Sequence, residues 1–120
     1  MNLLRKGLRF EQQARHYLEG HGLQLLESNF RCRFGEIDLI MRDADTVCFI
    51  EVRYRAQLDF GGAAASITTA KQRKIVKAAL FYLSAHPALV RHALRFDALL
   101  MQQGSGAIEY DWIRNAFYSE

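Results

Sequence analysis

The sequence has few residues that cross-link a chain or anchor it in a membrane. It has two cysteines and four histidines in 120 residues, and no apolar run approaches the ~20 residues that a membrane span needs. Cys32 and Cys48 are not part of a CxxC pair, and the histidines add no zinc-ligand spacing. Arg5, Lys6 and Arg9 interrupt the N-terminal leucines, so we expect no signal peptide. These absences predict a cytoplasmic protein with reduced thiols and no membrane association.

The composition is that of an ordinary globular domain. Hydrophobic residues make up 50% of the chain and charged residues 24%. At ~150 residues per domain, residues 1–120 form one domain, and a chain of this size buries roughly two-thirds of its surface. A real core is therefore expected without disulfides or a structural metal.

Charge is unevenly distributed along the chain. The net charge of +3 hides an acidic segment at 36–51, followed by a strongly basic one at 52–100. Twelve of the 16 basic residues are arginine, the better bidentate partner for phosphate. Such a chain can hold a divalent cation and also approach nucleic acid, although charge alone is equally typical of a mixed surface.

Hydrophobic periodicity predicts two helices and five strands. A helical stripe from Leu4 to Leu18 ends at Gly20 and Gly22, and a second helix, capped by Thr68 or Thr69, runs to about Ala85. Alternating or apolar runs predict strands at 23–31, 35–42, 46–54, 93–101 and 107–113, with a loop at 56–67. The order α-β-β-β-α-β-β indicates a small α/β domain with a mixed sheet.

Two carboxylates are expected to face each other across the central hairpin. A tight turn that pairs Asp43 with Thr46 places Asp38 opposite Glu51, with Cβ atoms ~5 Å apart. In the same register Glu36 lies opposite Arg53, with Glu36, Asp38 and Ile40 on one face and Ile37, Leu39 and Met41 on the other. Two like charges here need a shared proton, a basic neighbour or a hard cation such as Mg²⁺ or Mn²⁺. An ion-paired patch, with Arg53 bridging Glu36 and Glu51, is the alternative.

Polar residues also interrupt the apolar stripes of both helices. Glu11 falls among the core-facing positions of the first helix, and Gln72 falls on the apolar face of the second. Arg73, Lys74 and Lys77 point away from that face. The pattern suggests one polar pocket shared by helices and strands, although a glutamate at the rim of its face could also reach water.

Four segments of the chain carry a family resemblance. GEIDLI at 35–40, FIEVRYR at 49–55, FGGAAASIT at 60–68 and KQRKI at 71–75 resemble the YraN-like family of bacterial proteins. That family is thought to consist of endonucleases related to archaeal Holliday-junction resolvases, within the PD-(D/E)XK restriction-endonuclease-like superfamily. The resemblance runs from about Gly7 to Phe117. It implies one endonuclease-like domain of restriction-endonuclease-like fold, with a mixed sheet flanked by helices.

The resemblance also assigns roles to five residues. Asp38 matches the metal-binding aspartate of the superfamily and Glu51 the acidic residue of its (D/E)xK element. Glu11 matches the first-helix glutamate of resolvase-like members, as a third metal ligand, and Gln72 a helix glutamine near the site. Arg53 stands where the motif has lysine. Because arginine stays protonated, it cannot act as a neutral base, but it can stabilise developing charge.

The resulting hypothesis is an endonuclease, dependent on Mg²⁺ or Mn²⁺, that hydrolyses DNA phosphodiester bonds at branched or junction DNA. Phosphate contacts are assigned to five basic side chains: Arg55, Lys71, Arg73, Lys74 and Lys77. Analogy with resolvases implies a homodimer. The alternative from another functional class is a catalytically weak or inactive nucleic-acid-binding module of the same fold, and a structural polar pocket is the third reading. The sequence assigns no role to Glu36 or Asp97.

Overall fold

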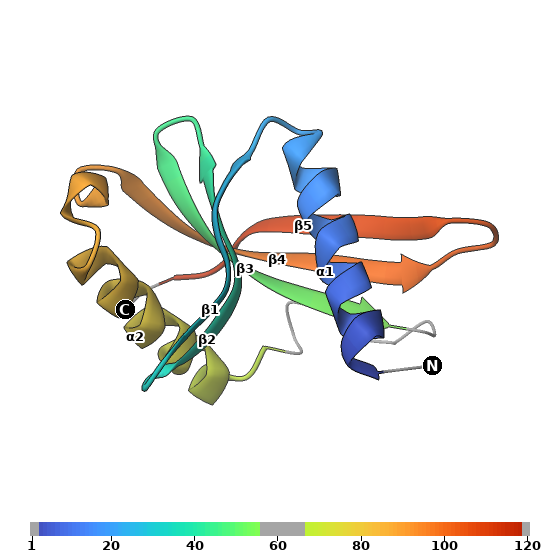
Figure 1. Ribbon diagram of the computed structural model, residues 1–120, viewed down its shortest axis with the longest axis horizontal. Helices are drawn as coiled ribbons and strands as arrows, with labels where there is room; N and C mark the ends of the chain where they lie inside the picture. The colour runs from blue at the N-terminus through green and yellow to red at the C-terminus, as the bar shows by residue number, and fades with distance from the viewer. Residues whose placement is uncertain (1–2, 56–66, 119–120) are drawn as a thin grey trace.

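The computed structural model describes residues 3–55 and 67–118, with no account of the side chains of residues 3–8 and Arg55. The elements of this part follow the predicted order (Figure 1). They are α1 (Leu3–Glu19), β1 (Gln24–Cys32), β2 (Gly35–Asp43), β3 (Thr46–Arg55), α2 (Thr69–Ser84), the 3-10 turn η2 (Pro87–Leu89), β4 (Ala93–Gln103) and β5 (Ile108–Phe117). None of the helices described is long and apolar enough to cross a membrane.

The strands form one mixed sheet in the order β1-β2-β3-β4-β5. Neighbouring strands are antiparallel except β3 and β4, which are parallel and are connected through α2. The fold class is therefore confirmed: the arrangement is that of a restriction-endonuclease-like α/β domain. Thr68 is the N-cap of α2, since its side chain accepts a hydrogen bond from the Lys71 backbone N–H.

Each face of the sheet has its own core, covered by one helix (Figure 1). Ala14 and Leu18 of α1 are fully buried against one face, as the helical stripe predicts. The side chains of Leu4 and Leu8, the other members of that stripe, lie outside the described residues. On the other face, α2 buries Ile75, Ala78, Ala79, Tyr82 and Leu83. The two helices thus fix the sheet between them and leave the ends of β2 and β3 to form a site.

The predicted face alternation of β2 is wrong at one point. Ile37 belongs to the core under α2, whereas Leu39 and Met41 belong to the core under α1. The strand changes face at Asp38, which is opposite Asn29 of β1, between the pairs Phe30–Ile37 and Ser28–Leu39. Asn29 has a left-handed φ of 53°, so the neighbouring backbone is irregular there.

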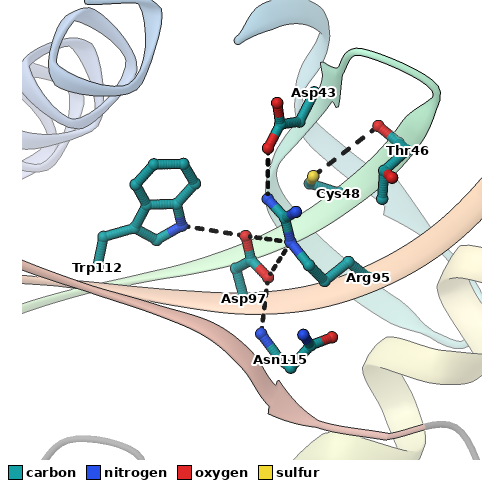
Figure 2. Close-up of polar contacts among 7 residues, drawn as sticks. All are labelled: Asp43, Thr46, Cys48, Arg95, Asp97, Trp112 and Asn115. Atoms are coloured by element: carbon teal, nitrogen blue, oxygen red, sulfur yellow. Dashed lines mark hydrogen bonds and ion pairs between the residues drawn. The ribbon is translucent and has the colours of Figure 1, made fainter. Parts of the chain in front are cut away.

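A buried charged network connects β4, β5 and the β2–β3 hairpin (Figure 2). The Asp97 carboxylate is fully buried and accepts hydrogen bonds from Arg95 Nε, at 2.9 and 3.1 Å, and from Trp112 Nε1, at 3.0 Å. It also accepts the backbone N–H of Asn115, at 3.1 Å, and Arg95 Nη2 reaches Asp43 Oδ2 at 3.0 Å. Asp97 therefore pairs with the Arg95 guanidinium and also accepts a backbone N–H of the irregular strand.

This network explains why β5 is longer than predicted. The pairing of β4 with β5 shifts between Phe96 and Ala98, and Asn115 has a φ of 54°. The hydrogen-bonding pattern of an ordinary strand breaks at such a bulge, but Asp97 accepts the Asn115 N–H and the strand continues to Phe117. The residue types after position 113 do not alternate in a way that predicts this continuation of the strand.

Candidate functional site

The candidate site lies where β2 and β3 separate. The two strands are paired from Asp43–Thr46 to Leu39–Ile50, which is the predicted register. The next pair in that register would be Asp38 and Glu51. Instead of a regular backbone pair, the Asp38 side chain accepts the Val52 backbone N–H through Oδ2 at 2.8 Å. Asp38 therefore lies across from Glu51 at the point where the hairpin opens.

Asp38 and Glu51 form an acid pair. The Glu51 side chain is only 8% exposed. Burial, followed by the hydrogen bond with Glu51 and the charge of Glu51, raises the pKa of Asp38 to about 8, while the Val52 hydrogen bond opposes the rise. The raised pKa favours a proton held by the pair near neutral pH, because burial disfavours two adjacent anions.

Lys71 of α2 supplies one such charge. Its Nζ lies 3.1 Å from Glu51 Oε2, and its side chain is 39% exposed. Lys71 was predicted as a phosphate contact, and its pairing with Glu51 was not predicted. Helical spacing in the sequence could have indicated the pairing. Lys71 precedes Ile75 by four residues and Ala78 by seven, so it begins the buried face of α2.

Glu11 borders the acid pair without joining it. Burial and then the charge of Glu36 raise the pKa of Glu11, and the charge of Glu11 in turn acts on Asp38. Glu11 also lines a cavity of about 130 Å³ with Ser28 and Asn29 of β1. Across residues 3–55 and 67–118, no three His, Cys, Asp or Glu side chains converge to hold a metal ion. A third-ligand role for Glu11 therefore stays a prediction.

The pairing predicted for Glu36 is wrong. Glu36 is exposed and its Oε2 lies 3.4 Å from Arg31 Nε, across the β1–β2 pair. Arg53 makes no ion pair with either Glu36 or Glu51 among the described residues, and its Nε is buried there without a hydrogen-bond partner. The bridge proposed for Arg53 fails because β2 and β3 separate before Glu36 could reach it.

The remaining predicted residues lie along α2. Gln72 is half-buried and donates from Nε2 to the Ile67 carbonyl at 2.9 Å, which holds the chain entering the helix. Arg73, Lys74 and Lys77 are exposed. A cavity of about 540 Å³ is lined in part by Gln72, Arg73 and Lys77. The side chain of Arg55 and residues 56–66 of the predicted loop at 56–67 lie outside the described residues.

The acid pair fits a hard divalent cation. Mg²⁺ binds through one or two carboxylates, with water and substrate phosphate as its other ligands, so Asp38 and Glu51 suffice as protein ligands. The raised pKa of Asp38 is the property such a site has without metal, because a cation would take the place of the shared proton. The donors are all oxygen, which suits Mg²⁺ or Mn²⁺ rather than zinc.

We expect Asp38→Asn to stabilise the metal-free protein at alkaline pH. The pKa of Asp38 rises on folding, so the folded state binds more protons than the unfolded state between about pH 4 and pH 8. The loss of folding stability that comes from ionising Asp38 is absent below about pH 4 and reaches its full value above about pH 8. Asparagine keeps the acceptor for Val52 and carries no charge, so the melting temperature of the variant should exceed that of the native protein above pH 8 and match it near pH 4.

Asp45→Asn is the control, because Asp45 is exposed in the β2–β3 turn. Mg²⁺ at 100 times its dissociation constant should add ~2.7 kcal/mol to the stability of the native protein and little to that of Asp38→Asn. A large loss of stability in metal-free Asp38→Asn at pH 8 would show instead that the carboxylate is a structural ion partner.

Comparison with known proteins places this chain among bacterial relatives of similar length. A UPF0102 protein of Nitrosomonas europaea is 54% identical over 112 residues, which cover 93% of this chain and 92% of the relative. One from Nitrosospira multiformis is 50% identical over 117 residues, covering 98% and 96%. One from Stutzerimonas stutzeri is 47% identical over 109 residues, covering 91% of each.

The family match spans the elements that build the site. The model of the uncharacterised protein family UPF0102 matches residues 10–101, from the turn of α1 that carries Glu11 to near the end of β4. Asp38, Glu51, Lys71 and the Asp97 network all lie within these bounds or are anchored there. The resemblance to YraN-like proteins is thereby confirmed at the level of the family. The chain belongs to the uncharacterised protein family UPF0102.

Proposed function

We propose that this protein is a DNA endonuclease of the PD-(D/E)XK type that depends on Mg²⁺ or Mn²⁺. The observation that carries the proposal is the Asp38–Glu51 pair: two carboxylates, largely withdrawn from water, at the opening between β2 and β3. If the pair were only structural, the repulsion between its two carboxylates would destabilise the fold permanently. In a cation site the bound ion offsets that repulsion. Asp38 and Glu51 would hold the ion, with Glu11 beside them.

The bound ion would polarise the scissile phosphate and acidify a water molecule. Around it, the protein contributes positive charge. Lys71 holds Glu51 in place through its 3.1 Å contact, and its three N–H donors can also reach a phosphate oxygen. Arg53 follows Glu51 by two residues on the same strand and has a buried N–H without a partner among the described residues. Both side chains are suited to stabilising the charge that develops on the phosphate.

The exposed face of α2 would hold the DNA backbone. Arg73, Lys74 and Lys77 lie on the same helix as Lys71, so phosphates bound by these residues pass close to the acid pair. Contacts of this kind position the duplex without reading its sequence. Each releases counterions, so binding should weaken with salt, with a log–log slope of about −0.9 per contact on duplex DNA.

The test is a cleavage assay on single-stranded, duplex, flap and four-way-junction DNA with Mg²⁺ or Mn²⁺. The native protein should cut at least one substrate, and Asp38→Asn should bind the same DNA but not cut it. Asp45→Asn should cut like the native protein, since Asp45 is exposed in the turn. If the native protein binds DNA in a salt-dependent way but cuts none with either metal, the non-catalytic binding module replaces the nuclease. If no DNA binds at low salt, both readings fail.

A further inference from the structure

A third cavity, of about 680 Å³, lies on the face of the sheet that α1 covers. It is lined by Arg9, Phe10 and Gln13 from α1, by Tyr54 at the end of β3, and by Tyr110 and neighbouring residues of the β4–β5 hairpin. Figure 1 shows α1 passing over the sheet beside this hairpin. The acid pair does not contribute to the lining, so this is a separate pocket.

The pocket interrupts a row of stacked aromatic rings between α1 and the sheet. Phe10 stacks on Tyr54 with ring centroids 3.8 Å apart and an interplanar angle of 15°. Tyr17, two turns further along α1, stacks on Tyr110 at 4.2 Å and 13°. Gln13 lies between Phe10 and Tyr17 on the helix, so an amide stands where the spacing would allow a third ring.

Gln13 is the unsatisfied group of this pocket. Its Oε1 is buried and has no hydrogen-bond partner within the part of the chain that the structure describes. Folded proteins rarely leave a buried carbonyl oxygen unpaired, and Gln13 is one of the residues that line the pocket. Arg9, which is exposed, adds a positive charge to the same lining. The pocket therefore offers flat apolar surface, an amide and a nearby cation.

We propose that this pocket binds an unpaired nucleobase of the DNA substrate, next to the phosphate that the acid pair acts on. A nucleobase offers a planar ring to stack on Tyr54 or Tyr110 and N–H groups for the Gln13 oxygen, and its own phosphate suits Arg9. The connection to the acid pair runs along α1: Phe10 precedes Glu11, and the charge of Glu11 acts on Asp38. Tyr54 follows Arg53 but lies on the face of the sheet that α1 covers, opposite the face on which Glu51 meets Lys71. The inference rests on the proposed function and narrows its substrate class.

The consequence is a preference among DNA structures. A base in a regular duplex is paired and stacked, so it enters a protein pocket only after both interactions are broken. A flap, a single strand or a branch point offers an unpaired base without that cost. The substrate class is therefore DNA with an unpaired nucleotide beside the scissile phosphate.

The experiment measures binding in EDTA, where cleavage does not contribute. Two DNAs of the same sequence are compared, a fully paired duplex and a flap that carries the fluorescent base 2-aminopurine in its unpaired strand. The native protein should bind the flap at least about tenfold more tightly, the scale of one base stacked on one aromatic ring, and should quench its fluorescence. Free deoxyadenosine monophosphate is a third probe. It tests whether the pocket binds single nucleotides that are not part of a DNA strand.

Gln13→Met is the decisive variant, since it keeps the length of the side chain and removes the amide. It should abolish most of the flap preference while the melting temperature stays equal or rises, because an unpaired buried carbonyl is lost. If Gln13 mattered only for folding, its substitution would lower both the preference for the flap and the melting temperature. Tyr110→Ala should also lose the preference. Phe81→Ala is the matched control: Phe81 is 40% exposed, makes a T-shaped contact with Phe34 and lies on α2 away from the pocket.

Equal affinity of the native protein for duplex and flap would overturn the proposal, and so would an unchanged preference in Gln13→Met. Tight binding of the free nucleotide, without competition by the flap, would assign the pocket to a small molecule instead. A flap preference in a protein that cuts no DNA with Mn²⁺ would keep the base site and reject the nuclease. Cleavage of every substrate with no flap preference would keep the nuclease and reject the base site.

Discussion

Replacing Asp97 by alanine is expected to cost about 3–5 kcal/mol of unfolding free energy, enough to unfold a marginal domain. Asp97 is fully buried and receives Arg95, Trp112 and the backbone N–H of Asn115 (Figure 2). Truncation leaves the Arg95 guanidinium, whose side chain is only 14% exposed, with Asp43 as its remaining ion partner among the described residues. It also leaves the bulge of β5 without its acceptor. Urea denaturation at pH 7 measures the loss.

Glu36→Ala is the matched control for this prediction. Glu36 also pairs with an arginine across two strands, but the side chains of Arg31 and Glu36 are 76% and 59% exposed. An ion pair in water contributes less than about 1 kcal/mol, so the control should change little. The double variant Arg95→Met with Asp97→Leu should recover the part of the loss that comes from the unpaired Arg95 charge, while Trp112 and the Asn115 N–H stay without their acceptor. Equal effects of Asp97→Ala and Glu36→Ala would show that the network does not stabilise the fold.

The sequence was sufficient to predict the parts of the fold that depend on local patterns. The β2–β3 register follows from a turn between Asp43 and Thr46 and from alternation along two adjacent strands, so it could be derived by counting residues from the turn. The fold order follows from periodicity in the same way. The choice of Asp38 and Glu51 needed more than that, since like charges at this spacing fit several explanations until the family resemblance was added.

What failed depends on contacts between distant segments. The face change of β2 at Asp38 is tied to the left-handed backbone of Asn29, in the neighbouring strand. The Lys71–Glu51 contact requires knowing how α2 returns over the sheet after β3. The Asp97 network gathers side chains from three strands, β2, β4 and β5, and only its Arg95–Asp97 spacing is visible in the chain. Helical and strand periodicity carry no information on such pairings.

The second large effect is expected in catalysis, where Lys71 rather than Arg53 is in contact with the acid pair. In the PD-(D/E)XK superfamily, to which the proposed function assigns this protein, a lysine two residues after the acidic residue supplies the nearby positive charge. Here that position is Arg53, and the lysine ammonium that lies 3.1 Å from Glu51 comes from α2. If charge near the phosphate is what matters, Lys71→Ala should lower the cleavage rate at saturating DNA by roughly 10²–10³-fold, the scale of one transition-state donor.

Arg53 has a separate expected result. Its guanidinium stays protonated near neutral pH, so it can act only through charge and hydrogen bonds. Arg53→Lys should then retain measurable cleavage and Arg53→Ala should lose as much as Lys71→Ala. Lys74→Ala is the control on the exposed face of α2. Under the proposed function Lys74 would contact only the DNA backbone, so the variant should raise the DNA concentration needed for half-maximal rate and leave the saturated rate nearly unchanged.

The comparison that separates the mechanisms uses one branched substrate with Mn²⁺. If the native protein and Arg53→Ala are both inactive while Arg53→Lys cuts, a neutral lysine at that position is required and the charge mechanism is wrong. If Lys71→Ala cuts at the native rate, Lys71 serves only to neutralise Glu51 in the metal-free protein. If Lys71→Ala and Arg53→Ala each lose two to three orders of magnitude and Arg53→Lys does not, both cations act on the phosphate, and the lysine of the motif has been replaced by one from the helix.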